Sequence, residues 1–122
     1  MKQEFREGIT IYSQIVSNIE NAILEGELKP EERLSSLRES AVEMEVNINT
    51  IMRAYNLLEE EGILRKKRGL GFFVSEDALK IIQKKRREAF YQNTVPELSK
   101  TLERLGINVD DLIEALKKEG TS

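Results

Sequence analysis

The feature that most constrains the fold of this chain is a pair of helix starts that lie only eleven residues apart. Ser36 and Glu39 form an S-x-x-E capping box, in which each side chain bonds an unpaired backbone N–H group at the start of a helix. Asn47 is a second favourable N-cap, so the first of these helices has room for about two and a half turns. Two helices this close in sequence must cross steeply, as in a helix-turn-helix.

The second helix, expected from Ile48 to Glu61, carries an apolar stripe on one side only. Four residues at helical spacing mark the side that faces the core: Ile51, Ala54, Tyr55 and Leu58. Four others fall off this stripe and are available to a partner: Asn49, Met52, Arg53 and Asn56. Gly62 ends the helix, because glycine readily adopts the left-handed conformation of a helix C-terminus.

A basic turn that contains glycine follows the second helix. Short β-prone runs at 63–64 and 72–74 flank Arg65 to Arg68 and the Gly69-Leu70-Gly71 tip, which predicts a two-stranded hairpin, or wing. Four adjacent cations repel one another, and an anionic backbone relieves that repulsion. A basic run is usually only solvated surface. Its place directly after a helix-turn-helix instead favours contact with duplex DNA.

Six motifs between Ile11 and Val74 carry a family resemblance: IYSQI (11–15), GELKP (26–30), SLR (36–38), NTIMRAY (49–55), LE (58–59) and GLGFFV (69–74). Together they resemble the DNA-binding domain of the GntR family of bacterial transcription regulators. The 48 residues after Val74 resemble the small two-helix tail of the YtrA-like subfamily. The resemblance implies a homodimeric repressor that occupies a promoter, commonly that of a neighbouring transporter operon.

Several residues depart from the family pattern. Four of them stand where the family usually has proline, glycine or leucine: Glu32, Ser35, Ser40 and Glu45. Met52 stands where other branches of the family often carry arginine, and Ile48 where proline or arginine is frequent. The resemblance therefore carries no base contact onto Ile48 or Met52.

The formal charge is −3, although a nucleic-acid binder is expected to carry a basic surface. The charges are unevenly distributed: residues 1–62 hold 6 Lys and Arg against 13 Asp and Glu, 63–90 hold 9 against 3, and 91–122 hold 4 against 6. Positive charge is concentrated in the wing and the segment after it. Screening over about 8 Å makes this local patch matter more at contact than distant acidic residues.

Composition excludes several other classes of protein. The 122 residues include no cysteine and no histidine, which rules out disulfides, thiolate or imidazole metal sites, cysteine nucleophiles and Ser-His triads. The acids at 59–61 lack a phosphate loop or cleft signature, so we expect neither an enzyme nor a cofactor. No apolar run approaches the ~18 residues of a membrane span, and the start MKQEFREGIT lacks a signal peptide's apolar stretch. We therefore expect a cytoplasmic protein with no membrane partner.

The first helix, expected from about Ile11 to Glu25, supplies an apolar side to the core. Tyr12 and Gln14 are candidate contacts for a partner, but a single aromatic on an apolar stripe is far more often a packing residue. An extended link should follow at 28–30, because the residue before Pro30 avoids the helical region.

A helical tail is expected after the wing. One helix should begin near Glu76, continue through Tyr91 and end or kink at Pro96, and two further helical stripes follow, the last from about Asp110. A segment of fewer than about 50 residues rarely sustains its own core. A second copy of the tail is the simplest partner, which predicts a two-fold dimer.

The expected fold is mainly α with a small β-hairpin: a winged helix-turn-helix DNA-binding domain at 1–75, followed by a short two-helix dimerisation tail at 76–122. In a homodimer the second helices of the two helix-turn-helix motifs would reach successive major grooves about 34 Å apart, which predicts a pseudo-palindromic operator. The candidate DNA-binding residues are Ser36, Arg38, Asn47, Asn49, Thr50, Arg53, Lys67, Arg68 and Gly69. No residue pattern identifies a small-molecule effector.

Arg38 and Arg53 are the strongest of these candidates. The resemblance places Arg38 at the family's DNA-contacting arginine, where it suits a phosphate or a guanine edge. The wing residues 67–69 would enter or skirt the minor groove, where glycine allows close approach of the backbone. For Ser36 and Asn47, helix capping competes with any DNA contact.

Two alternatives stay open. The basic run at 84–87 is either a solvated helix face or a contact with the DNA backbone beside the wing. The exposed second helix could also bind protein instead of DNA, as the overall acidity permits. Retention on duplex DNA separates these functions, because counterion release predicts a steep loss of DNA affinity with added salt.

Overall fold

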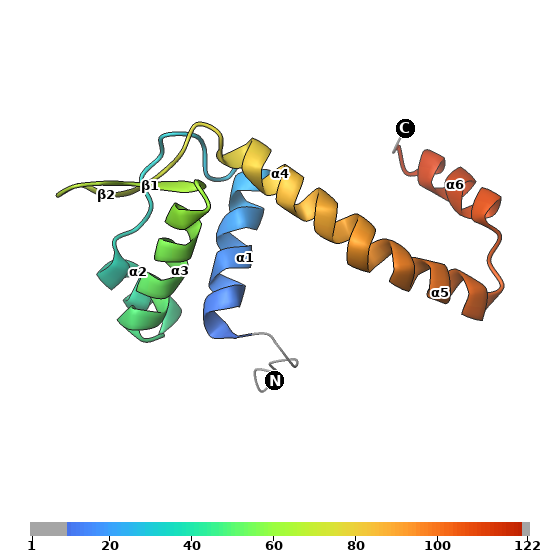
Figure 1. Cartoon of the computed structure of the whole chain (residues 1–122), viewed down its shortest axis with the longest axis horizontal. Helices are drawn as coiled ribbons and strands as arrows, with labels where there is room; N and C mark the ends of the chain where they lie inside the picture. The colour runs from blue at the N-terminus through green and yellow to red at the C-terminus, as the bar shows by residue number, and fades with distance from the viewer. Residues whose placement is uncertain (1–9, 121–122) are drawn as a thin grey trace. The chain divides into compact units, whose positions relative to one another are not determined.

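The computed structural model describes residues 10–120, and these are mainly helical (Figure 1). In chain order the elements are α1 (Ile11–Leu24), α2 (Leu37–Met44), α3 (Ile48–Glu60), β1 (Leu64–Lys67), β2 (Gly71–Val74), α4 (Ala78–Ala89), the π-helical turn η1 (Phe90–Thr94), α5 (Val95–Leu105) and α6 (Val109–Lys118). The chain forms two compact units that divide between Lys84 and Lys85. The first unit thus includes residues 76–84, which we expected to belong to the tail.

The first unit is a winged helix-turn-helix, as predicted. Its hairpin pairs β1 and β2 antiparallel, with Leu64 opposite Val74 and Lys67 opposite Gly71. A segment that precedes α2 pairs with the two-stranded hairpin through an isolated bridge between Arg33 and Phe73. The N–H of residue 34 also donates to the carbonyl of residue 72 at 2.9 Å. The wing is therefore anchored to the chain segment that leads into α2.

The core of this unit draws apolar side chains from α1, α3, the hairpin and the start of α4. The predicted stripe of α3 is buried, with Ile51, Ala54 and Leu58 fully inaccessible and Tyr55 2% exposed. Ala78 and Ile82 of α4 belong to the same core, which explains why the first unit continues past the hairpin. Burial on this scale fixes the orientation of α3, because each large apolar side chain contributes about 1.5–3 kcal/mol when buried.

Both predicted helix starts are confirmed. At α2, the Ser36 hydroxyl accepts a hydrogen bond from the Glu39 N–H at 3.0 Å, and the Glu39 carboxylate accepts one from the Ser36 N–H at 2.9 Å. At α3, the Asn47 side-chain oxygen accepts a hydrogen bond from the Asn49 N–H at 2.7 Å. Between these helices Glu45 adopts a left-handed conformation with φ 56° and ψ 45°. This conformation costs a residue with a side chain about 1–2 kcal/mol.

Pro96 was expected to end or kink the helix before it; the helix does not end, but its regular α-helical turns give way to η1 directly before the turn that contains Pro96. Helical structure runs without a break from α4 through η1 into α5, and Pro96 lies in the first turn of α5. In η1 the Val95 N–H bonds the carbonyl of Phe90, five residues earlier. This wider turn accommodates a proline, whose ring would clash with the carbonyl four residues back in a regular α-helix.

The second unit leaves its apolar residues exposed, as predicted for a tail that cannot bury them alone. The largest of these exposed side chains on α5, α6 and their connection are Leu98, Leu105, Ile107, Val109, Ile113 and Leu116. Asn108 caps α6 by accepting a hydrogen bond from the Asp110 N–H at 2.7 Å. Among residues 10–120, no helix is both long enough and apolar enough to cross a membrane.

Candidate nucleic-acid interface

The buried hydroxyl of Tyr55 ties α3 to α2. It lies 2.9 Å from the Ser40 hydroxyl and donates to the backbone carbonyl of Ser35 at 3.0 Å. Because a tyrosine has one hydroxyl proton, the Ser40 hydroxyl is the donor in the first of these bonds. The Tyr55 ring also meets the edge of Phe72 in the hairpin, with ring centroids 5.1 Å apart. The side chain of Tyr55 therefore fixes the positions of α2, α3 and the wing relative to one another.

This environment changes the acidity of Tyr55. Burial of the side chain raises the pKa of Tyr55 above its ordinary value of 10.0, although the hydrogen bond from Ser40 acts in the opposite direction. Tyr55 therefore stays neutral at physiological pH, which suits a group that links two helices through buried hydrogen bonds.

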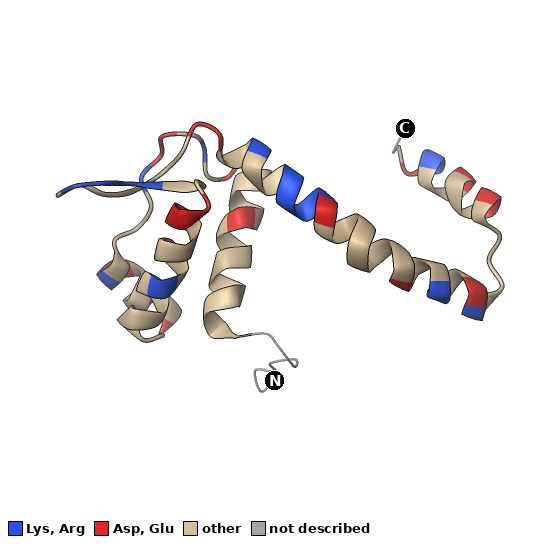
Figure 2. Cartoon of the chain, in the orientation of Figure 1, with Lys and Arg blue, Asp and Glu red and all other residues tan. Residues whose placement is uncertain are grey.

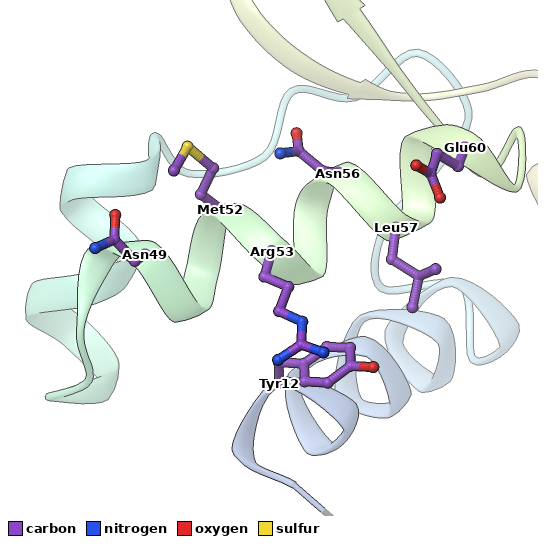
Figure 3. A pocket seen from close by; sticks show the side chains of 7 residues that line it. All are labelled: Tyr12, Asn49, Met52, Arg53, Asn56, Leu57 and Glu60. Carbon is purple, nitrogen blue, oxygen red and sulfur yellow. The ribbon is translucent and has the colours of Figure 1, made fainter.

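The side of α3 opposite this stripe faces solvent, as predicted. Asn49, Met52, Arg53 and Asn56 are exposed, and together with Tyr12, Leu57 and Glu60 they line an open hollow beside α1 (Figure 3). A neighbouring hollow around the start of α3 brings together four of the candidate contacts: Asn47, Asn49, Thr50 and Arg53. A surface of this kind, which carries amides and a cation at the start of an exposed helix, suits the edges and phosphates of a nucleic acid.

Arg53 reaches from α3 toward α1 and covers the ring of Tyr12 (Figure 3). The central guanidinium carbon lies 3.9 Å from the ring centroid, within cation–π distance. The ring of Tyr12 also packs against the core. The sequence-based interpretation of Tyr12 as a packing residue is therefore correct, but it missed this second role of supporting Arg53.

Arg38 is exposed on the first turn of α2. It borders a third open hollow, whose lining is Arg33, Ser36, Arg38, Glu39, Val42 and Glu43. Ser36 and Glu39 are engaged with each other in the capping box, and the hydrogen bonds from Ser36 hold the pKa of the Glu39 carboxyl below its ordinary value. Arg38 thus stands beside a helix N-terminus, where backbone N–H groups favour an anion.

The wing presents its cations along β1 and at the tip (Figure 2). Arg68 and Gly69 are exposed at the turn, which closes through a 2.8 Å bond from the Leu70 N–H to the Lys67 carbonyl, with Gly69 at φ 77°. The Lys67 ammonium lies 4.3 Å from the centroid of the Phe73 ring and 3.8 Å from a carboxylate oxygen of Glu31. Lys67 is therefore held by its own neighbours, whereas Arg68 extends beyond them.

Arg33 is a candidate contact that the sequence did not reveal. Its Nε donates to the Leu70 carbonyl at 2.8 Å, and its guanidinium lies over Gly71, where an added Cβ would come within 3.3 Å of Nε. Arg33 also lines the hollow that contains Arg38. It thus connects the start of α2 with the base of the wing tip. No local pattern marks this role, because the two partners lie far apart in sequence.

Comparison with known protein families gives one match, and two curated relatives extend it. A family model described as "Bacterial regulatory proteins, gntR family" matches residues 11–74. The chain is 32% identical over 117 residues to the HTH-type transcriptional regulator YhcF of Bacillus subtilis (strain 168), which covers 96% of this chain and 95% of that protein. It is 41% identical over 73 residues to the HTH-type transcriptional repressor YtrA of the same organism, covering 60% of this chain and 56% of that protein.

Solved structures share the fold. A GntR family transcriptional regulator from Listeria monocytogenes superimposes with a TM-score of 0.75 at 34% identity, over 93% of this chain and 98% of that chain. AraR(DBD) in complex with operator ORR3 gives a TM-score of 0.54 at 27% identity, over 62% of this chain and 88% of that chain. The first similarity extends beyond the winged helix-turn-helix into the C-terminal helices.

Proposed function

Because this chain belongs to the GntR family of bacterial regulatory proteins, in its YtrA-like subfamily, we propose that it is a transcription repressor that binds a specific DNA operator. The observation that carries this proposal is the fixed position of α3. Tyr55 locks this helix to α2 and the wing, and the opposite side of the helix is exposed. Arg38 on α2 and Arg68 at the wing tip are exposed as well. A rigid helix with flanking cations is the form of a major-groove probe.

The candidate residues divide into two roles. Arg38 at the start of α2 and the wing residues Lys67, Arg68 and Gly69 would bind phosphates and position the protein, with Arg38 also able to reach a guanine edge. Residues on the exposed side of α3, among them Asn49 and Arg53, would lie nearest the bases. Thr50 is half-buried at the first turn of α3 and suits a phosphate beside the helix N-terminus. Ser36 and Asn47 act first as helix caps.

Binding of operator DNA as a function of salt tests the proposal. Counterion release predicts that affinity falls steeply with added salt. Arg38→Ala should cost about 1–3 kcal/mol and relax base preference if Arg38 reads a guanine, whereas Lys67→Ala should weaken all sequences alike and flatten the salt dependence. Lys29→Ala, which removes an exposed cation outside the helix-turn-helix and the hairpin, is the matched control and should change neither property.

One result would refute the Arg38 contact and another the DNA-binding function itself. If Arg38→Ala leaves operator affinity unchanged, the assignment of this contact fails. If the whole chain is not retained on any duplex at low salt, the alternative function takes precedence, namely a winged-helix module that binds protein through the exposed side of α3.

The proposal extends to a cytoplasmic homodimer formed through the C-terminal helices, which occupies a pseudo-palindromic promoter site, commonly one that controls a neighbouring transporter operon. The exposed apolar side chains of α5 and α6 support the dimer, because a second copy of the tail offers them a complementary surface. Sedimentation of the free protein at tens of micromolar tests the dimer, and a monomer at that concentration would refute it. Selection of bound fragments from the source genome would identify the promoter.

A further inference from the structure

The exposed side of α3 has an unusual composition for a surface that binds DNA. Ile48 and Met52 are each 40% exposed, although both are large and apolar. They lie one turn apart on the helix, and the exposed amides of Asn49 and Asn56 lie beside them. At 3.6 residues per turn these four side chains fall within about 100° of the helix circumference. We call them the amide–apolar face of α3: Ile48, Asn49, Met52 and Asn56.

The four side chains of this face are uncharged, and the exposed Glu59 lies on the same side of α3 two turns beyond Met52. Arg53 is the only cation on α3, and its guanidinium is stacked on the ring of Tyr12, on the side toward α1 (Figure 3). Met52 points away from Tyr12 in the same view. The amide–apolar face therefore offers a major groove two kinds of contact, which are hydrogen bonds from side-chain amides and contact with apolar groups.

The major groove distinguishes base pairs by these two kinds of contact. Guanine presents two acceptors that are read chiefly by arginine or lysine, and cytosine presents a donor that is read by acidic side chains. Adenine presents one donor and one acceptor that match the amide of asparagine, and thymine presents a methyl group that favours apolar side chains. The amide–apolar face matches adenine and thymine and lacks the groups that read guanine and cytosine.

We infer that the amide–apolar face of α3 reads A·T base pairs, with Ile48 and Met52 against thymine methyl groups and Asn49 against adenine. Asn49 lies in the first turn of α3, from which recognition helices usually reach base edges. Asn56 lies two turns farther on and supports the same preference at the edge of the contact. This inference rests on the proposed function and adds the class of base pair that α3 selects.

Replacement of thymine by deoxyuridine provides a direct test, because it removes the methyl group and keeps base pairing. Each thymine that touches Ile48 or Met52 should weaken binding about fourfold when replaced, since burial of one methyl-sized group contributes about 0.8 kcal/mol and 1.4 kcal/mol corresponds to tenfold. The measurement is the affinity of the full chain for a selected operator and for duplexes with one replacement each.

Variants assign the effect to particular side chains. Met52→Ala should abolish the sensitivity to deoxyuridine at one position of each half-site, and Ile48→Ala at another. Met52→Arg should shift the preferred base pair at its position from A·T to G·C. Leu79→Ala on α4, which truncates a side chain with a similar 41% exposure outside the helix-turn-helix, should leave the full fourfold sensitivity.

The outcomes separate this inference from the proposed function. If the chain binds duplex DNA with steep salt dependence but deoxyuridine has no effect at any position, the inference is overturned and the proposed function stands. Selection of half-sites with G·C pairs at the positions altered by Met52→Arg would also overturn it. If the chain binds no duplex, the proposed function itself fails. Thermal unfolding of each variant checks that the exposed substitutions leave the fold intact.

Discussion

The two compact units of this protein treat apolar side chains in opposite ways. In the first unit, Ile51, Leu58 and Ile82 have no solvent exposure, and each lies on a different turn or helix of one shared core. In the second unit, Leu105 is 68% exposed and Val109 57% exposed. The difference shows that a short chain buries its own apolar side chains only when several helices and strands pack around one shared core. Helices that follow one another without a shared core need the surface of a partner to bury their apolar side chains.

Truncation of a core residue should show the largest contrast between the units. Leu58→Ala should lower the free energy of unfolding by about 2–5 kcal/mol, because it leaves a cavity in a filled core. Leu105→Ala, the matched truncation in the second unit, should change the unfolding of the first unit by less than about 0.5 kcal/mol. Urea unfolding followed by circular dichroism measures both. Equal losses of stability in the two variants would contradict the difference between the two units.

A charge introduced into the second unit tests whether its exposed apolar side chains form an interface. Ile113→Glu should convert the proposed dimer to a monomer in sedimentation experiments, because an unpaired carboxylate would be buried between the tails. Operator affinity should then fall roughly hundredfold, or about 2.7 kcal/mol, since the second half-site is no longer tethered. Glu114→Gln changes the neighbouring exposed residue and should leave the dimer intact. A dimeric Ile113→Glu protein would contradict this role of the tail.

The buried hydroxyl of Tyr55 tests whether the first unit depends on polar contacts as well as apolar ones. Tyr55→Phe keeps the ring and removes the bonds to Ser40 and to the Ser35 carbonyl, which should cost about 1–3 kcal/mol of stability. Tyr12→Phe is the control, because it removes a hydroxyl from a tyrosine that is only half-buried. No loss in Tyr55→Phe would show that apolar packing alone sets the position of α3.

The same residue predicts a pH dependence. The pKa of Tyr55 is raised in the folded state, so its stabilising effect is complete below the unfolded value of 10.0 and is lost as pH rises through the folded value. Unfolding experiments above pH 10 should therefore show a decline in stability that is smaller in Tyr55→Phe. An identical decline in both proteins would assign the effect to other groups.

The turn between α2 and α3 should give a smaller effect, confined to the first unit. Glu45→Gly relieves a left-handed conformation that costs about 1–2 kcal/mol, against about 0.4–1 kcal/mol from the greater freedom of the unfolded chain. The net gain in stability should be about 0.5–1 kcal/mol by urea unfolding. Glu43→Gly, at an ordinary helical position of α2, should instead lower stability by a similar amount.

Local signals in the sequence were sufficient for much of the fold. The caps at Ser36 and Asn47 and the stripe of α3 depend on residues within a few positions of one another, so they could be predicted without tertiary information. The rule that Pro96 ends or kinks the helix was equally local: the helix does not end there, but a π-helical turn interrupts the regular α-helix directly before it. The π-helical register at 90–94 changes which carbonyl the proline ring meets, and nothing within the local pattern indicates that register.

Contacts between distant segments could not be predicted in the same way. The stacking of Arg53 on Tyr12 and the bond from Arg33 to the Leu70 carbonyl each join residues far apart in the chain. The backbone pairing of residues 31–34 with β2 likewise depends on the free edge that the hairpin offers. The candidate residues were found by type and spacing, while their partners required the three-dimensional arrangement.

Glu31 gives the wing a counterion that cannot diffuse away. Its carboxylate lies 3.8 Å from the Lys67 ammonium and 3.9 Å from the Arg65 guanidinium, so an approaching phosphate must compete with it. The competition weakens the hold of the wing on arbitrary duplex and shortens each encounter with a wrong site during sliding along DNA. Glu31→Gln should therefore prolong dwell times on random duplex severalfold in stopped-flow dissociation, which would slow the search for the correct site.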